Sequence, residues 1–203
     1  MQLTSAQVAA LELIRQKQFT LVHGVTGSGK TEIYLRAAAQ VIAAGKQVIV
    51  LVPEISLTPQ TIKRFAARFN IAVLHSALTP KERRENWQKI VNNEARLVVG
   101  ARSALFAPFR DLGLIVIDEE QDNSYKQDNN PRYNAVRTAL ERARLCGAKL
   151  ILGTATPALE TFYLFQNPPD GRYGYIYLPQ RINGRPLPPA EIVDMRAELN
   201  NGN

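Results

Sequence analysis

Short hydrophobic runs alternate with longer amphipathic stretches along most of the chain. The runs read FTLVHG, QVIVLVP, IAVLHS, RLVVGA, LGLIVIDE and KLILGT. Between them, stretches such as TEIYLRAAAQVIAAG and YNAVRTALERARLCG carry apolar residues at helical spacing, and each ends at a glycine suited to a helix C-terminus. Strands that are apolar throughout and alternate with helices are typical of a parallel sheet covered on both faces. The pattern predicts an α/β fold with a mostly parallel sheet and helices on both faces.

Hydroxyl and amide residues mark several predicted helix starts. Thr58-Pro59 and Thr79-Pro80 each place a hydroxyl that can cap a helix before a proline at the first helical position. Glu82, three residues after Thr79, completes a capping box, and Thr4 with Gln7 forms another. We therefore expect helices to begin at these points.

The alternation fades near Phe165. Six of the 12 prolines fall within residues 168–203, and the chain ends in the polar run ELNNGN. The stretch YGYIYL, residues 173–178, can add one more strand. We expect one α/β domain over residues 1–167 and a proline-rich extended linker over residues 168–203.

Composition narrows the classes of function. Lys and Arg number 25 against 18 Asp and Glu, and the resulting net charge of +7 favours a polyanionic partner such as nucleic acid. One cysteine excludes an internal disulfide framework, and with only two histidines no zinc site of the usual spacing can form. No apolar stretch is long enough to cross a membrane, and the N-terminus lacks the order of a signal peptide. We expect a cytoplasmic protein without a membrane partner.

Three further features have ordinary explanations. Trp87 lies on a predicted helix, where a packing role is more common than base stacking. The run KERR, residues 81–84, is typical of a solvated helix face. Cys146 is expected to be a small buried helix residue. It has no base partner that would suggest a nucleophile.

The turn after the first predicted strand matches the phosphate-loop pattern of glycine, four residues, then glycine-lysine-threonine. Its glycines let consecutive N–H groups wrap a phosphate chain, and the following helix points its positive end at the same phosphates. The lysine is expected to contact the β and γ oxygens and the threonine to hold Mg²⁺. The predicted nucleotide-binding residues are Gly24, Val25, Thr26, Gly27, Ser28, Gly29, Lys30 and Thr31.

Acidic residues follow the apolar run LGLIVI directly. A phosphate loop needs a carboxylate at a neighbouring strand end, and we expect Asp118 to hold Mg²⁺ through its water shell. Glu119 can take a proton from an attacking water. Two adjacent acids favour water as the nucleophile, and no guanine-reading Asn-Lys-x-Asp run or kinase lid is visible. ATP with Mg²⁺ is therefore the predicted cofactor pair, with Lys30, Asp118 and Glu119 as the catalytic residues.

Further segments at predicted strand ends read VPEISLTPQ, ARSALFAPF, SYKQDNNPRY and GTATPALET, with IVDMR later in the chain. This ordered set resembles the first, RecA-like motor domain of superfamily 2 helicases. It resembles most closely the family of primosomal replication-restart helicases (PriA, primosomal protein N'). The resemblance implies a bacterial, nucleoid-associated 3′-to-5′ DNA helicase that acts at stalled forks and contributes to primosome assembly. Single-stranded or forked DNA, primosome proteins and single-strand-binding protein are the implied partners.

The resemblance also implies parts outside this chain. The family has a fork-binding region, a second RecA-like domain with a zinc-binding insertion, and a C-terminal domain. Zinc is therefore expected only in those parts. The second RecA-like domain of the same protein is an expected partner of this one, and the isolated chain is expected to be weakly active.

The resemblance assigns roles along the strand ends. Gln7 is placed where such helicases read adenine, although a plain capping box explains it equally well. Pro53 and Glu54 border the expected nucleic-acid track. Arg102 and Ser103 lie in a segment expected to meet the DNA backbone, where relatives commonly have threonine in place of Ala101.

Three residues are expected to couple the nucleotide to DNA. Thr154 and Thr156 can bond to the acidic motif, although Thr156 before Pro157 also suits a helix start. Gln121 stands where the family has histidine. Glutamine can donate and accept hydrogen bonds but carries no proton at neutral pH, so its effect on coupling stays open.

The loop after the acids resembles the family's aromatic-rich segment, which senses DNA and signals to the nucleotide site. Tyr125 and Tyr133 can offer faces for base stacking, and Lys126 and Arg132 can neutralise phosphates. Two other interpretations remain open: another superfamily 2 DNA translocase, or a phosphate-loop regulatory or assembly module without helicase activity.

Overall fold

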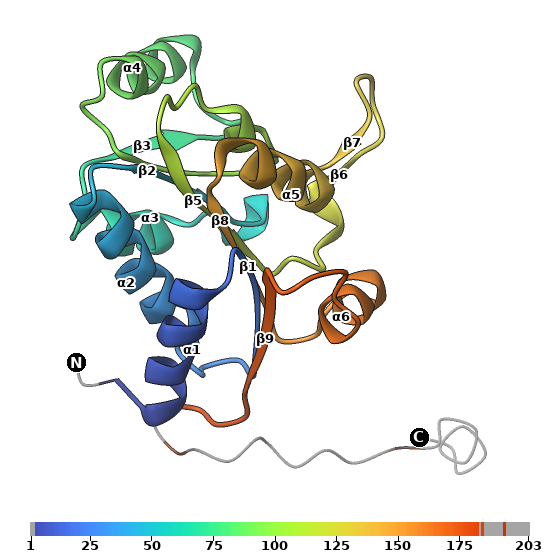
Figure 1. Cartoon of the computed structure of the whole chain (residues 1–203). Coiled ribbons are helices and arrows are strands. Elements are labelled where there is room, and N and C mark those ends of the chain that lie inside the picture. The colour runs from blue at the N-terminus through green and yellow to red at the C-terminus, as the bar shows by residue number, and fades with distance from the viewer. Residues whose placement is uncertain (1–2, 183, 185–192, 194–203) are drawn as a thin grey trace.

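The computed structural model describes residues 3–182, 184 and 193. Seven strands form one sheet in the order β3-β4-β2-β5-β8-β1-β9, and every neighbouring pair is parallel (Figure 1). The predicted α/β fold with a parallel sheet is confirmed. The strands are β1 (Phe19–Gly24), β2 (Gln47–Leu51), β3 (Ile71–Leu74), β4 (Leu97–Gly100), β5 (Leu112–Asp118), β8 (Lys149–Thr154) and β9 (Tyr173–Leu178).

Helices cover both faces of the sheet, as Figure 1 shows. The α-helices are α1 (Ser5–Gln16), α2 (Lys30–Ala43), α3 (Pro59–Ala66), α4 (Pro80–Val91), α5 (Ala135–Cys146) and α6 (Leu159–Gln166). Shorter elements lie in the connections: the 3-10 turns η1 (Glu54–Ser56), η2 (Arg102–Phe106) and η3 (Asn123–Tyr125), and the antiparallel pair β6 (Lys126–Gln127) and β7 (Tyr133–Asn134).

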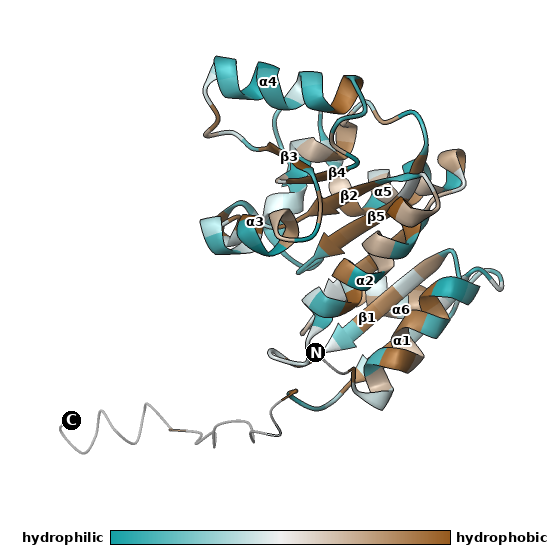
Figure 2. Ribbon diagram, turned by 90° about the vertical axis from the view of Figure 1, so that its left-hand side faces the viewer, coloured by the Kyte–Doolittle hydropathy of each residue, from teal (hydrophilic) through white to brown (hydrophobic). Residues whose placement is uncertain are grey.

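Two hydrophobic cores lie on opposite faces of the sheet. Along β5, Ile115 and Ile117 join the core under α4, α5 and α6, whereas Leu114 and Val116 join the core under α1, α2 and α3. Both faces of a strand are therefore buried, which explains the continuous apolar runs in the sequence. In Figure 2 the central strands β2 and β5 are brown and the outer helix α4 is largely teal.

Most predicted helix starts are confirmed. The Thr79 hydroxyl and Glu82 form the expected capping box of α4, and Thr58 caps α3. Thr4 and Gln7 form the capping box of α1. The alternative reading of Thr156 and Pro157 as a helix start is wrong, because α6 begins at Leu159.

The sheet continues past residue 167. Strand β9 pairs with β1 along its whole length, so a division at 167 separates two neighbouring strands. The expected extra strand at 173–178 is confirmed. Most of the expected linker, and all of IVDMR except Val193, lies outside the described residues.

Two expectations about packing are wrong. Cys146 is exposed, because it is the final residue of α5 and lies beyond Ala143, the last buried position of that helix. Trp87 is 44% exposed, since α4 buries only Ile90. The solvated face predicted for KERR is confirmed. None of the described helices is both long and apolar enough to cross a bilayer.

Candidate nucleotide-binding site

The phosphate loop joins β1 to α2. Gly27 and Gly29 have φ angles of +86° and +83°, a left-handed conformation that side chains disfavour. Gly29 is the N-cap of α2 and provides no side chain to bond the first N–H groups of the helix. Those N–H groups and the helix dipole are therefore available to an anion.

The last residue of β9 and the segment that follows it pack against the phosphate loop. The Val25 N–H donates to the Leu178 carbonyl at 3.1 Å, and the Ile182 N–H donates to the Gly27 carbonyl at 3.0 Å. A Cβ on Gly29 would collide with the Gln7 amide and the Ile182 side chain. The backbone conformation and the packing both require glycine there.

The sheet order brings the acids to this loop. Strand β8 lies between β5 and β1, and Asp118 at the end of β5 is in register with Gly153 of β8. Asp118 and Glu119 line a cavity of about 630 Å³ together with phosphate-loop residues from Thr26 to Thr31. The expected convergence of these groups on one site is present.

Two buried tyrosines hold Asp118 from different elements. Tyr34 of α2 donates its hydroxyl to Asp118 Oδ1 at 2.9 Å. Tyr125 donates to the main-chain oxygen of Asp118 at 2.7 Å. Burial raises the pKa of the Asp118 carboxyl, and the nearby Glu119 charge adds to the effect.

Glu119 has an unusual backbone conformation. Its φ of +49° lies in the left-handed region, which costs a non-glycine residue about 1 kcal/mol or more. The Glu120 N–H holds the turn by donating to the Gly153 carbonyl at 3.1 Å. Such strain is often found where a side chain must be presented to a ligand.

A chain of hydrogen bonds connects the acids with the GTATP segment. Gln121 Nε2 donates to Glu119 at 3.0 Å, and Thr154 donates its hydroxyl to Gln121 Oε1 at 2.6 Å. The Thr156 main-chain N–H then donates to the Thr154 hydroxyl oxygen at 3.0 Å. The three predicted coupling residues therefore lie in one network, with Thr156 joined through its backbone.

Glu120 has a role that the sequence did not reveal. Its carboxylate accepts the Ala158 N–H at 2.8 Å and the Thr161 hydroxyl at 2.9 Å, so it caps α6 from a distant part of the chain. Burial raises the pKa of this carboxyl, and the two hydrogen bonds oppose that effect. No local signal could have revealed the contact, because the partners are about forty residues apart.

Gln7 faces the loop rather than the cavity. Its side chain is buried, with Oε1 accepting the Thr4 N–H at 3.0 Å and Nε2 donating to the Ser28 carbonyl at 3.2 Å. Gln7 does not line the nucleotide cavity. The capping box is present, and adenine reading by Gln7, which the capping box does not exclude, stays a prediction.

Several residues that sequence reasoning missed line the same cavity. They are Glu32, Leu35, Arg64, Ala67, Arg68 and Ile182. Glu32 and Arg68 form an ion pair with N–O distances of 2.9 and 3.2 Å, which ties α2 to the end of α3. Arg64, Ala67, Arg68 and Ile182 gave no local signal because they are distant in sequence from the loop, whereas Glu32 and Leu35 follow it directly on α2 and lie outside the motif pattern.

A nucleotide fits the polar groups of the loop. Among the described residues, Ser28 Oγ and Arg181 Nε are the buried side-chain polar atoms that lack a hydrogen-bond partner. Both residues belong to the loop or its outer wall, since the Arg181 side chain packs on Gly27. Buried polar groups normally have partners, and Ser28 lines the cavity, so an anionic ligand at the loop is chemically consistent with its free hydroxyl, whereas Arg181 does not line the cavity.

A second hollow lies between the turns η1 and η2 and the loop that follows the acids. It has a volume of about 210 Å³ and is lined by Glu54, Ser76, Ala101, Arg102, Ser103, Ser124 and Gln127. Glu54 is exposed and its carboxylate accepts the Ser76 hydroxyl, whereas Pro53 is buried. The structure therefore brings Glu54, Arg102 and Ser103 together, as expected for a nucleic-acid track, but not Pro53.

Arg102 anchors the loop that follows the acids. Its guanidinium donates to the carbonyls of Ser124 and Lys126 and lies 5.6 Å from the centre of the Tyr133 ring. Tyr133 also contacts Phe106, with ring centres 5.2 Å apart. Arg102 thus links the hollow to the loop.

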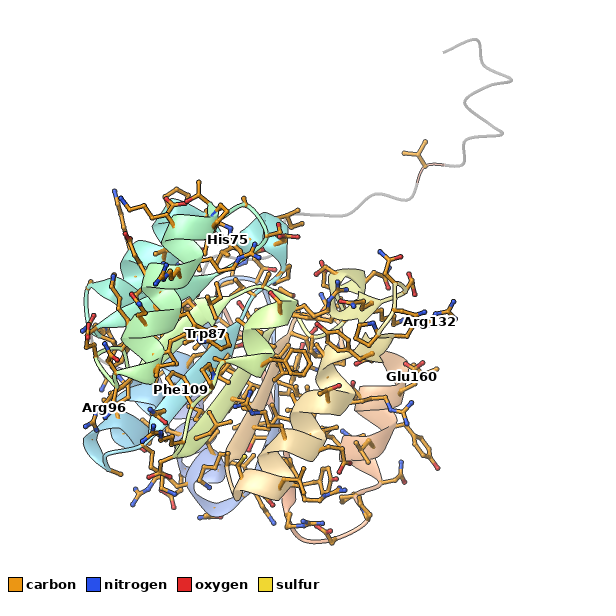
Figure 3. All side chains as sticks on the ribbon, turned by 90° about the horizontal axis from the view of Figure 1, so that it is seen from above. His75, Trp87, Arg96, Phe109, Arg132 and Glu160 are labelled. Atoms are coloured by element: carbon orange, nitrogen blue, oxygen red, sulfur yellow. The ribbon has the colours of Figure 1, made fainter. Side chains whose placement is uncertain are left out.

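The predicted DNA-binding residues of this loop differ in their exposure to solvent. Lys126 and Arg132 are exposed, and Figure 3 shows Arg132 at the periphery of the molecule. Tyr133 is half-buried. The expectation that Tyr125 stacks on a base is wrong for this conformation, because its ring is buried in the core and its hydroxyl is bonded to Asp118.

A family profile described as DEAD/DEAH box helicase matches residues 4–164. The chain belongs to the DEAD/DEAH box helicase family. This helicase-family chain is 51% identical to "Replication restart protein PriA" of Bacillus subtilis over 209 residues, which cover 99% of this chain and 26% of that protein. It is 46% identical to the protein of the same name from Synechocystis sp., covering 100% of this chain and 25% of that one. The resemblance inferred from the motifs is confirmed.

The helicase-family chain spans about a quarter of the length of these curated relatives. Its fold is similar to that of the crystal structure of the Pyrococcus furiosus Hef helicase domain. The TM-score is 0.61 at 23% identity, covering 84% of this chain and 38% of that one. The fold is therefore that of a RecA-like helicase domain.

Proposed function

We propose that this chain is the nucleotide-binding half of a DNA helicase motor that acts in replication restart. The observation that carries the proposal is the shared cavity of the phosphate loop and the carboxylates of Asp118 and Glu119. A phosphate-binding turn beside a strand-end acid pair is the arrangement that nucleoside-triphosphate hydrolysis requires. The similarity to replication restart proteins supports the biological setting.

The residues of the site have separate roles in this proposal. Magnesium-ATP, when bound, supplies the γ-phosphoryl group whose hydrolysis drives a motor. Lys30 would bind phosphate oxygens. To do so, its ammonium would give up the 2.8 Å hydrogen bond that it donates to the Gly24 carbonyl. Thr31 and Asp118 would hold Mg²⁺, partly through water, and Glu119 would accept a proton from the attacking water.

DNA would run past the hollow between Glu54 and Arg102, in contact with the exposed cations of the following loop. Arg102, Lys126 and Arg132 provide positive charge there, and the half-buried Tyr133 ring offers an aromatic surface. Thr154, Gln121 and Glu119 form the physical connection by which such a strand would affect the nucleotide site.

We further propose a 3′-to-5′ direction, forked DNA as the substrate and action in the bacterial cytoplasm near the nucleoid. The second RecA-like domain, primosome proteins and single-strand-binding protein are the proposed partners. This chain spans about a quarter of the length of those relatives, which supports a contribution from further domains. The transition-state arginine would come from the second motor domain, so this chain alone should hydrolyse ATP slowly.

The test is a nucleotide titration with and without forked DNA, on this chain and on the longer protein. A helicase motor predicts that DNA and nucleotide change each other's affinity, and that DNA binding weakens steeply with salt. Nucleotide binding that ignores DNA in the longer protein would instead favour a regulatory or assembly module. Rapid DNA-stimulated hydrolysis by the 203 residues alone would contradict the expected need for a second domain.

A further inference from the structure

Tyr34 lies one helical turn after Lys30 and points to the carboxylate that closes the other side of the cavity. It is 1% exposed, and its hydroxyl donates to Asp118 Oδ1 at 2.9 Å. Residues four apart share a helix face, so the helix that presents Lys30 to phosphate also presents Tyr34 to the acid. The phosphate loop and the acid pair are therefore connected through a side chain that neither motif contains.

The neighbouring strand is shaped to admit this hydroxyl. Gly153 is in register with Asp118, and a Cβ at Gly153 would overlap the Tyr34 hydroxyl. The φ angle of Gly153 is not in the left-handed region, so its backbone does not require glycine. The space beside Asp118 is what requires it, and that space is filled by the tyrosine.

The second tyrosine near Asp118 acts on a different atom. Tyr125 donates to the main-chain oxygen of Asp118, whereas only Tyr34 donates a side-chain hydrogen bond to the carboxylate among the described residues. A hydrogen bond to one carboxylate oxygen fixes the rotation of the side chain, as an outer-shell partner does for a metal ligand. The Asp118 side chain lines the nucleotide cavity in that fixed orientation.

We propose that Tyr34 is a positioning residue that orients the Asp118 carboxylate toward magnesium. This inference rests on the proposed function, in which Asp118 holds the Mg²⁺ of Mg-ATP. Tyr34 touches neither nucleotide nor metal. Its effect is therefore on how strongly magnesium strengthens nucleotide binding, and not on the binding of the phosphate chain to the loop.

The experiment compares wild type with Tyr34→Phe. For each protein, the affinity for fluorescent ADP is measured over a range of Mg²⁺ concentrations and also in EDTA without Mg²⁺. We expect affinity in EDTA to stay within about twofold, because the loop is unchanged. The Mg²⁺ concentration that gives half of the Mg²⁺-dependent gain in ADP affinity should rise about tenfold in Tyr34→Phe, the usual result of losing an outer-shell partner. Tyr163→Phe is the matched control, since Tyr163 is 68% exposed on α6 and far from the acids in sequence.

A second variant reaches the same hydroxyl from the other side. Gly153→Ala keeps the Tyr34 side chain but places a methyl group where its hydroxyl lies, 3.3 Å from Asp118 Oδ1, so it should separate the hydroxyl from the carboxylate and raise the Mg²⁺ requirement in the same direction. Thermal unfolding of each variant separates this effect from loss of the fold. Tyr34→Phe adds no atom to the core and is the deciding variant, and Gly153→Ala is used in addition where its unfolding temperature shows a folded protein.

The outcomes separate this inference from the proposed function. Unchanged Mg²⁺ dependence in Tyr34→Phe, with a normal wild-type response, overturns the role of Tyr34 alone. Equal loss of affinity with and without Mg²⁺ also overturns it, because the hydroxyl would then support the loop. A wild-type protein whose nucleotide binding ignores Mg²⁺ contradicts the proposed function and this inference together.

Discussion

Thr154 donates its hydroxyl to the amide oxygen of Gln121 at 2.6 Å, which joins β8 to the turn that carries Glu119. Together with the Gln121–Glu119 bond, it connects the side chains of the acidic turn with the GTATP segment. Gln121 uses its oxygen toward Thr154 and its nitrogen toward Glu119, so both ends of the amide are engaged. A neutral histidine also offers one donor and one acceptor, so glutamine can fill the same place without titrating.

Thr154→Val should weaken the coupling between nucleotide and DNA. Valine keeps the shape but removes the hydroxyl, which breaks the connection between Gln121 and the Thr156 backbone. We expect any enhancement of single-stranded DNA affinity by Mg-nucleotide to fall about fivefold, equivalent to about 1 kcal/mol. Fluorescence anisotropy of an oligonucleotide, with and without nucleotide, measures this quantity. Thr61→Val on α3 is the control, and an unchanged enhancement in Thr154→Val would refute the link.

Tyr125→Phe should destabilise the fold although the ring stays in place. The change removes the donor to the buried Asp118 carbonyl, and an unsatisfied buried acceptor costs about 1–2 kcal/mol. Chemical denaturation of both proteins gives the difference in unfolding free energy. Tyr163→Phe, at an exposed site, should change stability by less than about 0.5 kcal/mol. Equal stability of Tyr125→Phe and wild type would mean that the hydroxyl bond contributes nothing.

The phosphate loop, the acids and Tyr125 show which parts of the site could be predicted from the sequence alone and which could not. The phosphate loop and the acids were predictable because each occupies a few consecutive residues, and the alternation of strands and helices placed them on one edge. Tyr125 was misjudged because burial depends on contacts across the sheet, and its neighbours in sequence are polar. Glu120 and Tyr34 went unnoticed for the same reason, since their partners lie on other elements.

Glu119→Gly should be more stable than Glu119→Ala. Both variants lose the hydrogen bond from Gln121, but glycine adopts the left-handed φ of +49° without the steric cost that alanine bears, and we expect a difference of about 0.5–1 kcal/mol. Both variants should lose ATP hydrolysis because the proposed base is gone. Denaturant unfolding of the two proteins gives the difference. A glycine variant no more stable than the alanine variant would contradict the assignment of strain to this turn.

His23 should make the protein less stable as the pH falls below 6.5, its ordinary pKa. Its ring contacts the Tyr175 hydroxyl at Nδ1 and the Ala155 carbonyl at Nε2, and it lies near the Tyr177 ring and the Lys30 charge. Burial lowers the pKa of His23 below its usual 6.5, and Lys30 adds to the effect although the Ala155 bond opposes it. The unfolded chain therefore binds the proton first on acidification, so stability falls as pH drops through 6.5 and levels off below the folded pKa.

The measurement for His23 compares wild type with His23→Gln at each pH. The unfolding free energy of wild type relative to the variant should rise as the pH is raised toward 6.5, because only wild type has this titrating group. The comparison cancels the contributions of other groups that titrate in both proteins. A flat or falling difference would show that the ring is not held neutral by its surroundings.

The most direct test of the account is calorimetric titration of Mg-ADP into wild type and Lys30→Ala. Both proteins should be folded, because the one hydrogen bond of the Lys30 ammonium to the described residues goes to the Gly24 carbonyl. The account predicts one site in wild type, strengthened by Mg²⁺, and affinity at least tenfold weaker in Lys30→Ala, as expected for losing a charged contact. Equal binding by the two proteins, or wild-type binding that is indifferent to Mg²⁺, would contradict a single site formed by the phosphate loop and the acids.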